Sequence, residues 1–438
     1  MRIDKLYLKN FRGFKEREFV FEKNFSVISG DNGSGKTSIL EGLCVALGGW
    51  LYAFDGVDSK DKRNIALSDR RVIVGKVNSA PLPQIPVQVK CWAEITGQNI
   101  EWERAITSRN GRTTRGGLSD ISKLSKVYNE KIYTGNDEDV ILPIVAYYSA
   151  ARLWNEPIQR AQRERRIKKE KVRLEGYNKS ISFSNSIKDA MYTIDRIAYL
   201  AYREDDPTSL HEINSILNAI QKSIDHSMPN VKVTYNTKIA EICVTDRTGL
   251  SILYSKLSDG YRCMISLIVD ICRRMITLNP QLGESAIDKT PGVVLIDEID
   301  LHLHPKWQKS VVSDLKTIFP KIQFISTTHS PFIIQSLKED ELILLSDAND
   351  EVEYVGESIE DISENVMGVS NPQYSKEKEE MYTAAQQFYK DLDSVRAPEE
   401  MAQIEETLKR LTAKYSGDIA YYAFLEQKFL EKKITMEG

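Results

Sequence analysis

A glycine-rich segment near the N-terminus has the composition and spacing of a phosphate-binding loop. Residues 30–37 read Gly-Asp-Asn-Gly-Ser-Gly-Lys-Thr, after the apolar run 25–29 and before an amphipathic pattern from Lys36 to about Leu47. Glycines let consecutive backbone N–H groups face phosphates, the lysine reaches the β- and γ-phosphates, and the next hydroxyl binds Mg²⁺. We expect a site for a nucleoside triphosphate and Mg²⁺ at Asn32, Gly33, Ser34, Gly35, Lys36, Thr37 and Ser38.

Two acids follow an apolar run much later in the chain. Residues 293–296 are Val-Val-Leu-Ile, and Asp297 and Glu298 come directly after them. Such a run is typical of a parallel strand that is buried on both faces, and ligands bind beyond the carboxyl ends of such strands. Read alone, the pair equally fits a helix cap. Together with a phosphate loop, Asp297 is a candidate to hold Mg²⁺ through water and Glu298 a candidate general base.

Two further patterns lie on either side of these acids. Ser258, Asp259 and Gly260 precede a strongly apolar helix, which alone would indicate an ordinary helix cap. A second buried run, residues 322–328, ends at His329. A lone histidine is usually structural, but its position at a strand end favours a functional role.

The order of these motifs resembles that of the ABC-class ATPases. The sequence Leu-Ser-Asp-Gly-Tyr at 257–261 is similar to the family signature Leu-Ser-Gly-Gly-Gln, from which Asp259 and Tyr261 depart. The resemblance implies that ATP is the ligand and that Ser258, Asp259 and Gly260 contact the γ-phosphate of an opposite copy. A head-to-tail dimer or a higher even oligomer would follow. It also implies a D-loop at Asp300 and the switch histidine at His329.

The N-terminal residues Asn10-Phe11-Arg12 resemble the opening of RecF-like and SMC-like ATPases. That resemblance places Arg12 near the nucleotide, whereas an ordinary strand-to-turn arginine fits the residues equally well. Residues 142–154 and 364–369 resemble the PtuA-type ATPases of the Septu and some retron phage-defence systems. These work with a nuclease on a separate chain, which we expect to be of the HNH type, with Toprim as the second candidate. Residues 330–438 contain no histidine, so an HNH site cannot lie there.

Other functions remain open at this level. A RecF-like or SMC-like DNA-repair ATPase that binds DNA directly is the main alternative, and a static ATP cofactor that only assembles the oligomer is another. A transporter ATPase fits least. The basic stretch 160–173 is either a solvated helix face or a nucleic-acid contact.

The buried strands and helices that must position these residues indicate an α/β fold. We expect an ABC-type head with a mostly parallel central sheet, an antiparallel β-subdomain, a helical lid insertion and C-terminal helices. The expected divisions are 1–150 for the N-terminal ATPase lobe, 151–250 for the insertion, 251–350 for the C-terminal lobe, and 351–438 for helices that dock a partner or an oligomer. A net charge of −4, five dispersed cysteines and the lack of a long apolar run indicate a cytoplasmic protein with no membrane partner.

Overall fold

A computed structural model describes residues 1–73, 81–135, 139–150, 173–181, 187–225, 228–345, 353–396, 398–415 and 419–437. Two compact units divide the chain, Met1–Ile359 and Glu360–Gly438. No helix among the described residues is long and apolar enough to cross a membrane. The expected divisions near 150 and 250, and the roles given to them, stay predictions.

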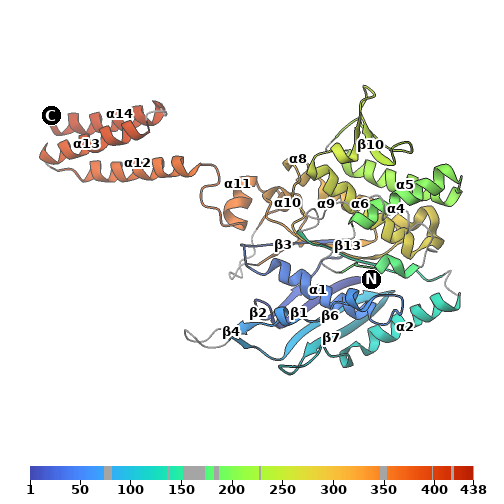
Figure 1. Cartoon of the computed structure of the whole chain (residues 1–438). Helices are drawn as coiled ribbons and strands as arrows, with labels where there is room; N and C mark the ends of the chain where they lie inside the picture. The colour runs from blue at the N-terminus through green and yellow to red at the C-terminus, as the bar shows by residue number, and fades with distance from the viewer. Residues whose placement is uncertain are drawn as a thin grey trace. The chain divides into compact units, whose positions relative to one another are not determined.

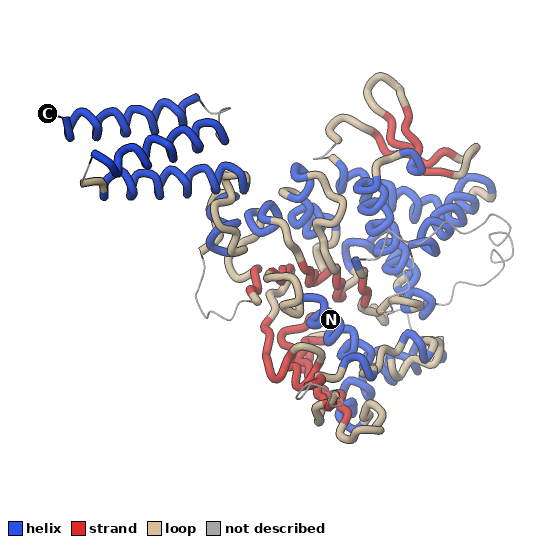
Figure 2. The backbone as a smooth tube through the Cα atoms, turned by 60° about the vertical axis from the view of Figure 1, so that its left-hand side comes forward, coloured by secondary structure: helices blue, strands red, loops and turns tan. Residues whose placement is uncertain are grey.

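A parallel sheet forms the centre of the first unit (Figures 1 and 2). Its strands lie in the order β14-β3-β13-β12-β8, and each described neighbour pair is parallel. Every residue of β3, β8, β12 and β13 is buried, as the continuous apolar runs in the sequence predict. The bounds are β3 Phe25–Ser29, β8 Ile144–Tyr148, β12 Gly292–Ile296, β13 Ile322–Thr327 and β14 Leu342–Leu344.

A second, antiparallel sheet has the order β2-β1-β6-β7. Its strands are β1 Arg2–Phe11, β2 Phe14–Val20, β6 Val87–Ile95 and β7 Gln98–Ile106. Buried and half-buried residues alternate along β6, where Val87, Val89 and Cys91 alternate with polar residues in the sequence. One face of this sheet therefore packs on the core.

Helix α1, Lys36–Leu51, lies between the two sheets (Figure 1). It contacts β1, β6 and β7 on one side and β13 on the other. Every residue from Ile39 to Leu51 is buried, so the helix is apolar nearly all round. At Gly48 a Cβ atom would lie 2.5 Å from the carbonyl oxygen of Arg63, and the absence of a side chain there allows the two segments to approach.

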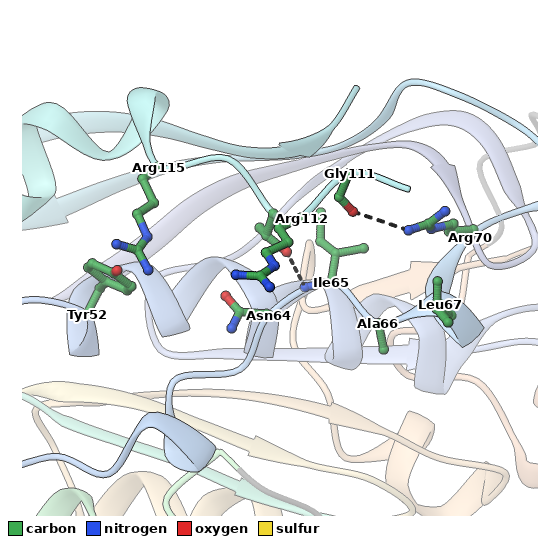
Figure 3. Close-up of a pocket in the computed structure, with 10 residues that line it drawn as sticks. Tyr52, Asn64, Ile65, Ala66, Leu67, Arg70, Gly111, Arg112 and Arg115 are labelled. Atoms are coloured by element: carbon green, nitrogen blue, oxygen red, sulfur yellow. Dashed lines mark hydrogen bonds between the residues drawn. The ribbon is translucent and has the colours of Figure 1, made fainter. Parts of the chain in front are cut away.

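Two loops beside the antiparallel sheet bracket a pocket (Figure 3). One loop follows α1 and supplies residues 64–67 and Arg70, and the other follows β7 and supplies residues 111–113 and Arg115. Tyr52, which follows the last residue of α1, completes the lining.

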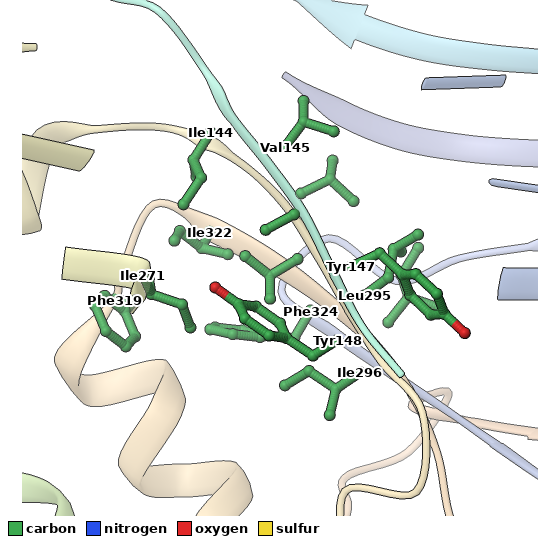
Figure 4. Packing of buried hydrophobic residues seen from close by; sticks show 14 of the residues in the cluster. Ile144, Val145, Tyr147, Tyr148, Ile271, Leu295, Ile296, Phe319, Ile322 and Phe324 are labelled. Atoms are coloured by element: carbon green, nitrogen blue, oxygen red, sulfur yellow. The ribbon is translucent and has the colours of Figure 1, made fainter. Parts of the chain in front are cut away.

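Helices cover the other face of the parallel sheet. Here α6, Asp259–Leu278, packs against α4, Ile187–Arg203, and α5, Pro207–Ile224, and α9, Val311–Ile318, lies beside α5. The core between sheet and helices includes Tyr148, Ile271, Phe319 and Phe324 (Figure 4). The predicted ABC-type α/β head, with its parallel sheet, antiparallel subdomain and helices, is therefore confirmed.

A buried charged group joins α6 to the parallel sheet. The Asp270 carboxylate on α6 accepts hydrogen bonds from the Tyr148 hydroxyl at 2.8 Å and from Arg274 Nε at 2.8 Å. Arg273 donates to the other carboxylate oxygen at 2.6 Å and 3.0 Å. Such a group is tolerated inside a core because all three charged side chains are paired and hydrogen-bonded.

The segment between β8 and α6, expected to be mainly helical, also contains three strands. A small antiparallel sheet in the order β11-β10-β9 contains β9 Lys232–Asn236, β10 Glu241–Thr245 and β11 Ser251–Leu253. Of the basic stretch 160–173, residues 160–172 lie outside the described residues. Arg173 donates to the carbonyl oxygens of Leu278 and Val140, so this one residue has a structural role.

The second unit contains α12 Lys376–Ser394, α13 Pro398–Lys414 and α14 Ile419–Glu437. Helix α13 begins at Pro398, a residue type that suits the first turn of a helix. The apolar residues that recur every three or four positions form a separate core, in which Phe388 and Leu425 are almost fully buried. The Tyr421 hydroxyl joins α14 to α12 by donating to the Met381 carbonyl oxygen at 3.0 Å.

Candidate nucleotide site

The glycine-rich segment forms a loop between β3 and α1. Gly33 and Gly35 have φ angles of 85° and 102°, in the left-handed region that favours glycine. A Cβ atom on Gly35 would lie 2.6 Å from the Phe14 ring, so a larger residue does not fit unless that ring moves. The Ser34 hydroxyl oxygen is buried and has no hydrogen-bond partner among the described residues. The loop therefore has the backbone conformation and a spare polar group that a phosphate site needs.

Lys36 folds back over this loop. Its Nζ donates to the carbonyl oxygens of Gly30 at 2.6 Å and Asp31 at 2.8 Å. Burial lowers the pKa of Lys36, and the nearby carboxylates of Asp297 and Asp31 oppose that shift. The ammonium group is thus held at the loop by carbonyl groups, and phosphate oxygens are stronger partners for it.

Asp297 lies directly after β12 and faces Thr37 at the start of α1. The Thr37 hydroxyl is 3.1 Å from Asp297 Oδ2 and 3.3 Å from Oδ1. A hydroxyl and a carboxylate that converge beside a phosphate loop are oxygen ligands of the kind Mg²⁺ uses, together with phosphate oxygens and water. The described residues contain no group of three or more His, Cys, Asp or Glu that could hold a metal alone. The donor set therefore fits Mg²⁺ bound jointly with a triphosphate.

Thr327, at the end of β13, connects the two acids. Its hydroxyl donates to Asp297 Oδ1 at 2.6 Å and accepts the Glu298 backbone N–H at 2.8 Å. Glu298 itself has a φ of 52°, which costs a non-glycine residue about 1–2 kcal/mol. Strain of this kind collects at functional sites, where the surrounding contacts hold it. Sequence reasoning gave Thr327 no role, although a polar residue at the end of a buried strand was a usable signal.

Asp300 organises the chain around His329. Its Oδ1 accepts the Thr328 hydroxyl at 2.5 Å and the His329 backbone N–H at 3.4 Å. The strands that precede these residues, β12 and β13, are adjacent and parallel, so both segments emerge at the same edge of the sheet. The structure thus brings together Lys36, Thr37, Asp297, Glu298, Asp300 and His329, which the sequence singled out separately.

Arg12 belongs to a cluster of paired charges beside α1. Its Nε donates to Asp69 at 3.0 Å, and its terminal nitrogen lies 3.5 Å from Glu41. Arg63 pairs with the same two acids, at 2.9 Å and 3.0 Å. Burial raises the pKa of Glu41, against the opposing effect of Arg12 and Arg63. Sequence reasoning missed Asp69, Arg63 and Glu41, although an acid within the apolar run of α1 was a signal for a buried ion pair.

The signature residues lie at the start of α6. Ser258 occupies the N-cap position, but its side chain accepts no capping hydrogen bond, so an ordinary cap does not explain it. Ser258 and Asp259 are exposed, and Asp259 pairs with Arg262. Gly260 lies so close to the segment after the acidic pair that a Cβ atom would be 2.3 Å from the His302 carbonyl oxygen. Exposed side chains at a helix start suit contact with another molecule.

Comparison with known families identifies ATPase domains along the chain. A family model described as an AAA domain matches residues 5–226, and one described as an AAA ATPase domain matches residues 157–334. The first covers the phosphate loop, and the second covers the signature, the acidic pair and His329.

Individual relatives agree with these matches. A retron Vc95 probable ATPase from Vibrio cholerae is 26% identical over 392 residues, which cover 79% of this chain and 74% of that protein. The Septu protein PtuA from Bacillus mycoides is 38% identical over 141 residues, 30% of this chain and 19% of that protein. The solved SMC head domain from Thermotoga maritima is 18% identical, with 78% and 94% coverage and a TM-score of 0.39. The predicted likeness to retron and Septu ATPases is confirmed.

Proposed function

We propose, because the chain belongs to the AAA domain family of ATPases, that it is the ATP-hydrolysing subunit of a Septu-like or retron-like phage-defence complex. One observation carries the proposal: the phosphate-loop residues Lys36 and Thr37 lie at the same edge of the parallel sheet as two acids. Asp297 contacts Thr37, and Thr327 joins Asp297 to Glu298. Their chemistry is that of phosphoryl transfer from a nucleotide to water.

Each of these residues has a separate task. The loop N–H groups and Lys36 bind the β- and γ-phosphates, with Arg12 near the nucleotide, and this fixes the γ-phosphate in position. Glu298 accepts a proton from the attacking water, so that the oxygen forms a bond to the γ-phosphorus as the bond to the β-phosphate oxygen breaks. His329, whose backbone N–H donates to Asp300, contributes its side chain as a donor to the γ-phosphate. Thr37 and Asp297 would hold Mg²⁺, which when bound neutralises the charge on the phosphate oxygens.

A second copy of the chain supplies the rest of the site in this proposal. Ser258, Asp259 and Gly260 lie at the N-terminal end of a twenty-residue helix, where backbone N–H groups and the helix dipole favour an anion. Because Ser258 and Asp259 are exposed, they are accessible to the γ-phosphate of a partner copy. Hydrolysis would then require a head-to-tail pair or a higher even oligomer.

The hydrolytic cycle would control a nuclease on another chain, most simply one of the HNH type. The relatives named for retron and Septu systems support the defence setting. The helical unit of α12, α13 and α14 is the proposed docking element for that partner or for further copies.

Affinity purification from the native operon tests this function. We expect an even-numbered assembly that carries ATP and a second chain with nuclease activity, and we expect Glu298→Gln to retain more ATP through purification. A lone chain without nucleotide would remove the proposal. An assembly that carries DNA but no nuclease would move the function to DNA repair.

A further inference from the structure

A pocket without any phosphate-loop residue in its lining contains three arginines and no acid. Its cavity volume is about 710 Å³, and its lining includes Arg70, Arg112 and Arg115 but no Asp or Glu (Figure 3). Asp69, the acid next to Arg70 in sequence, pairs instead with Arg12 and Arg63. The pocket therefore has a concentrated positive charge in a protein whose net charge is −4.

The deepest of these cations is buried and only partly satisfied. The Arg70 side chain is 7% exposed and donates to the carbonyl oxygens of Arg109 and Gly111. Its Nε is buried and has no hydrogen-bond partner among the described residues. A buried donor without a hydrogen-bond partner is unfavourable, and more so when it is charged. An anion in the pocket would compensate the charge of this buried guanidinium.

A second buried arginine lies directly behind the lining residue Asn64. Arg104 is 1% exposed, and its partners are the Asn64 side-chain oxygen and the carbonyl oxygens of Val45 and Arg63. Burial lowers the pKa of Arg104 to about 10. Within the described ranges, neither Arg70 nor Arg104 pairs with a carboxylate. Two uncompensated charges near one cavity need a negative partner more than either would alone.

The mouth of the pocket is also basic. Arg112 and Arg115 are exposed, and the Arg115 guanidinium lies 4.7 Å from the centre of the Tyr52 ring. Because Lys62 lies over the same ring at 5.8 Å, Tyr52 orients cations and is not an open stacking platform. Arginine is suited to phosphate because its planar guanidinium can donate two parallel hydrogen bonds.

We propose that this pocket is a second anion site, which takes the phosphate group of a nucleotide, either free or within a nucleic acid strand. The ligand contacts Arg112 and Arg115 at the mouth and compensates the charge of the buried Arg70. The lining contains no residue of the phosphate loop, and occupancy of the pocket does not require hydrolysis.

Binding measurements on a Lys36→Ala background test the proposal, since that change weakens the contribution of the phosphate loop. The probes are a short fluorescein-labelled single-stranded DNA, followed by anisotropy, and AMP, followed by calorimetry, both in EDTA. We expect the variant Arg112→Ala/Arg115→Ala to bind at least one probe about tenfold more weakly. If the DNA is the ligand, the plot of log K against log salt concentration has a negative slope, and loss of two phosphate contacts should make that slope shallower by about 1.4.

A matched control is Lys126→Ala/Lys238→Ala, which removes two exposed positive charges elsewhere in the same unit. Its affinity for both probes should stay at the level of the background. Loss of AMP binding alone in the arginine variant assigns the site to a free nucleotide, and loss of DNA binding alone assigns it to a strand. The proposal is overturned if the arginine variant binds both probes normally, if the lysine control loses as much, or if the background chain binds neither probe.

Discussion

The Thr327 hydroxyl donates a 2.6 Å hydrogen bond to the carboxylate of Asp297, and both residues stand where adjacent parallel strands end. The same hydroxyl accepts the Glu298 backbone N–H, so one side chain fixes the candidate Mg²⁺ ligand and the candidate general base together. A polar residue of β13 therefore sets the geometry of the two acids that follow β12.

Replacing Thr327 with valine should slow ATP hydrolysis by about tenfold or more while the chain stays folded. The change keeps the shape of the side chain, but it removes a hydrogen bond to a charged group, which is worth about 1.5–3 kcal/mol. Steady-state hydrolysis gives the measurement. Thr317→Val, at an exposed position of α9 where the hydroxyl bonds only to its own helix, is the control. A wild-type rate in Thr327→Val would show that this bond does not position the acids.

Glu298→Gln should separate nucleotide binding from hydrolysis. Loss of a general base reduces rates by about 10²–10⁴-fold, whereas the phosphate loop and Lys36 are unchanged. We expect ATP affinity within about threefold of wild type, since the interactions lost form only during reaction. Glu339→Gln, an exposed change, provides the comparison. Equal loss of binding and hydrolysis would argue that Glu298 is structural.

The fold and much of the site were predictable because they depend on local patterns. Apolar runs followed by acids or by a histidine identified β12 and β13, and the glycine spacing identified the loop before α1. The partners within the Arg12–Asp69–Arg63–Glu41 cluster were not predictable, because they are separated by up to 57 residues and meet only through tertiary packing. Glu41 within an apolar run indicated only that some buried ion pair exists. Thr327 was missed for a related reason, since its role depends on the neighbouring strand.

Mixing two inactive variants tests whether the site is completed by a second copy. Lys36→Ala removes the phosphate contact, and Ser258→Arg places a bulky cation at the exposed start of α6. If Ser258 acts on the partner's nucleotide, a mixed pair has one site with both defects and one intact site, so mixing should restore part of the hydrolysis. The control is the double variant Lys36→Ala/Ser258→Arg, assayed by itself. Failure of the mixture to exceed either variant alone would place the signature outside the reacting site.

Asp270 is the buried carboxylate of α6, and its protonation should dominate the loss of stability of this helix as the pH falls. Burial acts to raise the pKa of Asp270, but the guanidinium groups of Arg274 and Arg273 outweigh it and hold that pKa well below its usual range. Because the pKa is lower in the folded chain, its stabilisation is fully present above the unfolded value of about 3.9 and is lost as the pH falls through the folded value.

Asp270→Asn should therefore lower the free energy of unfolding by about 3–5 kcal/mol at neutral pH, because it leaves two buried guanidinium groups without a carboxylate. The difference from wild type should shrink in acid, once the wild-type carboxylate is itself protonated. Thermal unfolding midpoints across the acid range measure both effects. Asp120→Asn, whose exposed carboxylate pairs with Lys123, should leave the midpoint unchanged because exposed ion pairs contribute little. A pH-independent difference between wild type and Asp270→Asn would mean that packing, and not charge, accounts for the loss.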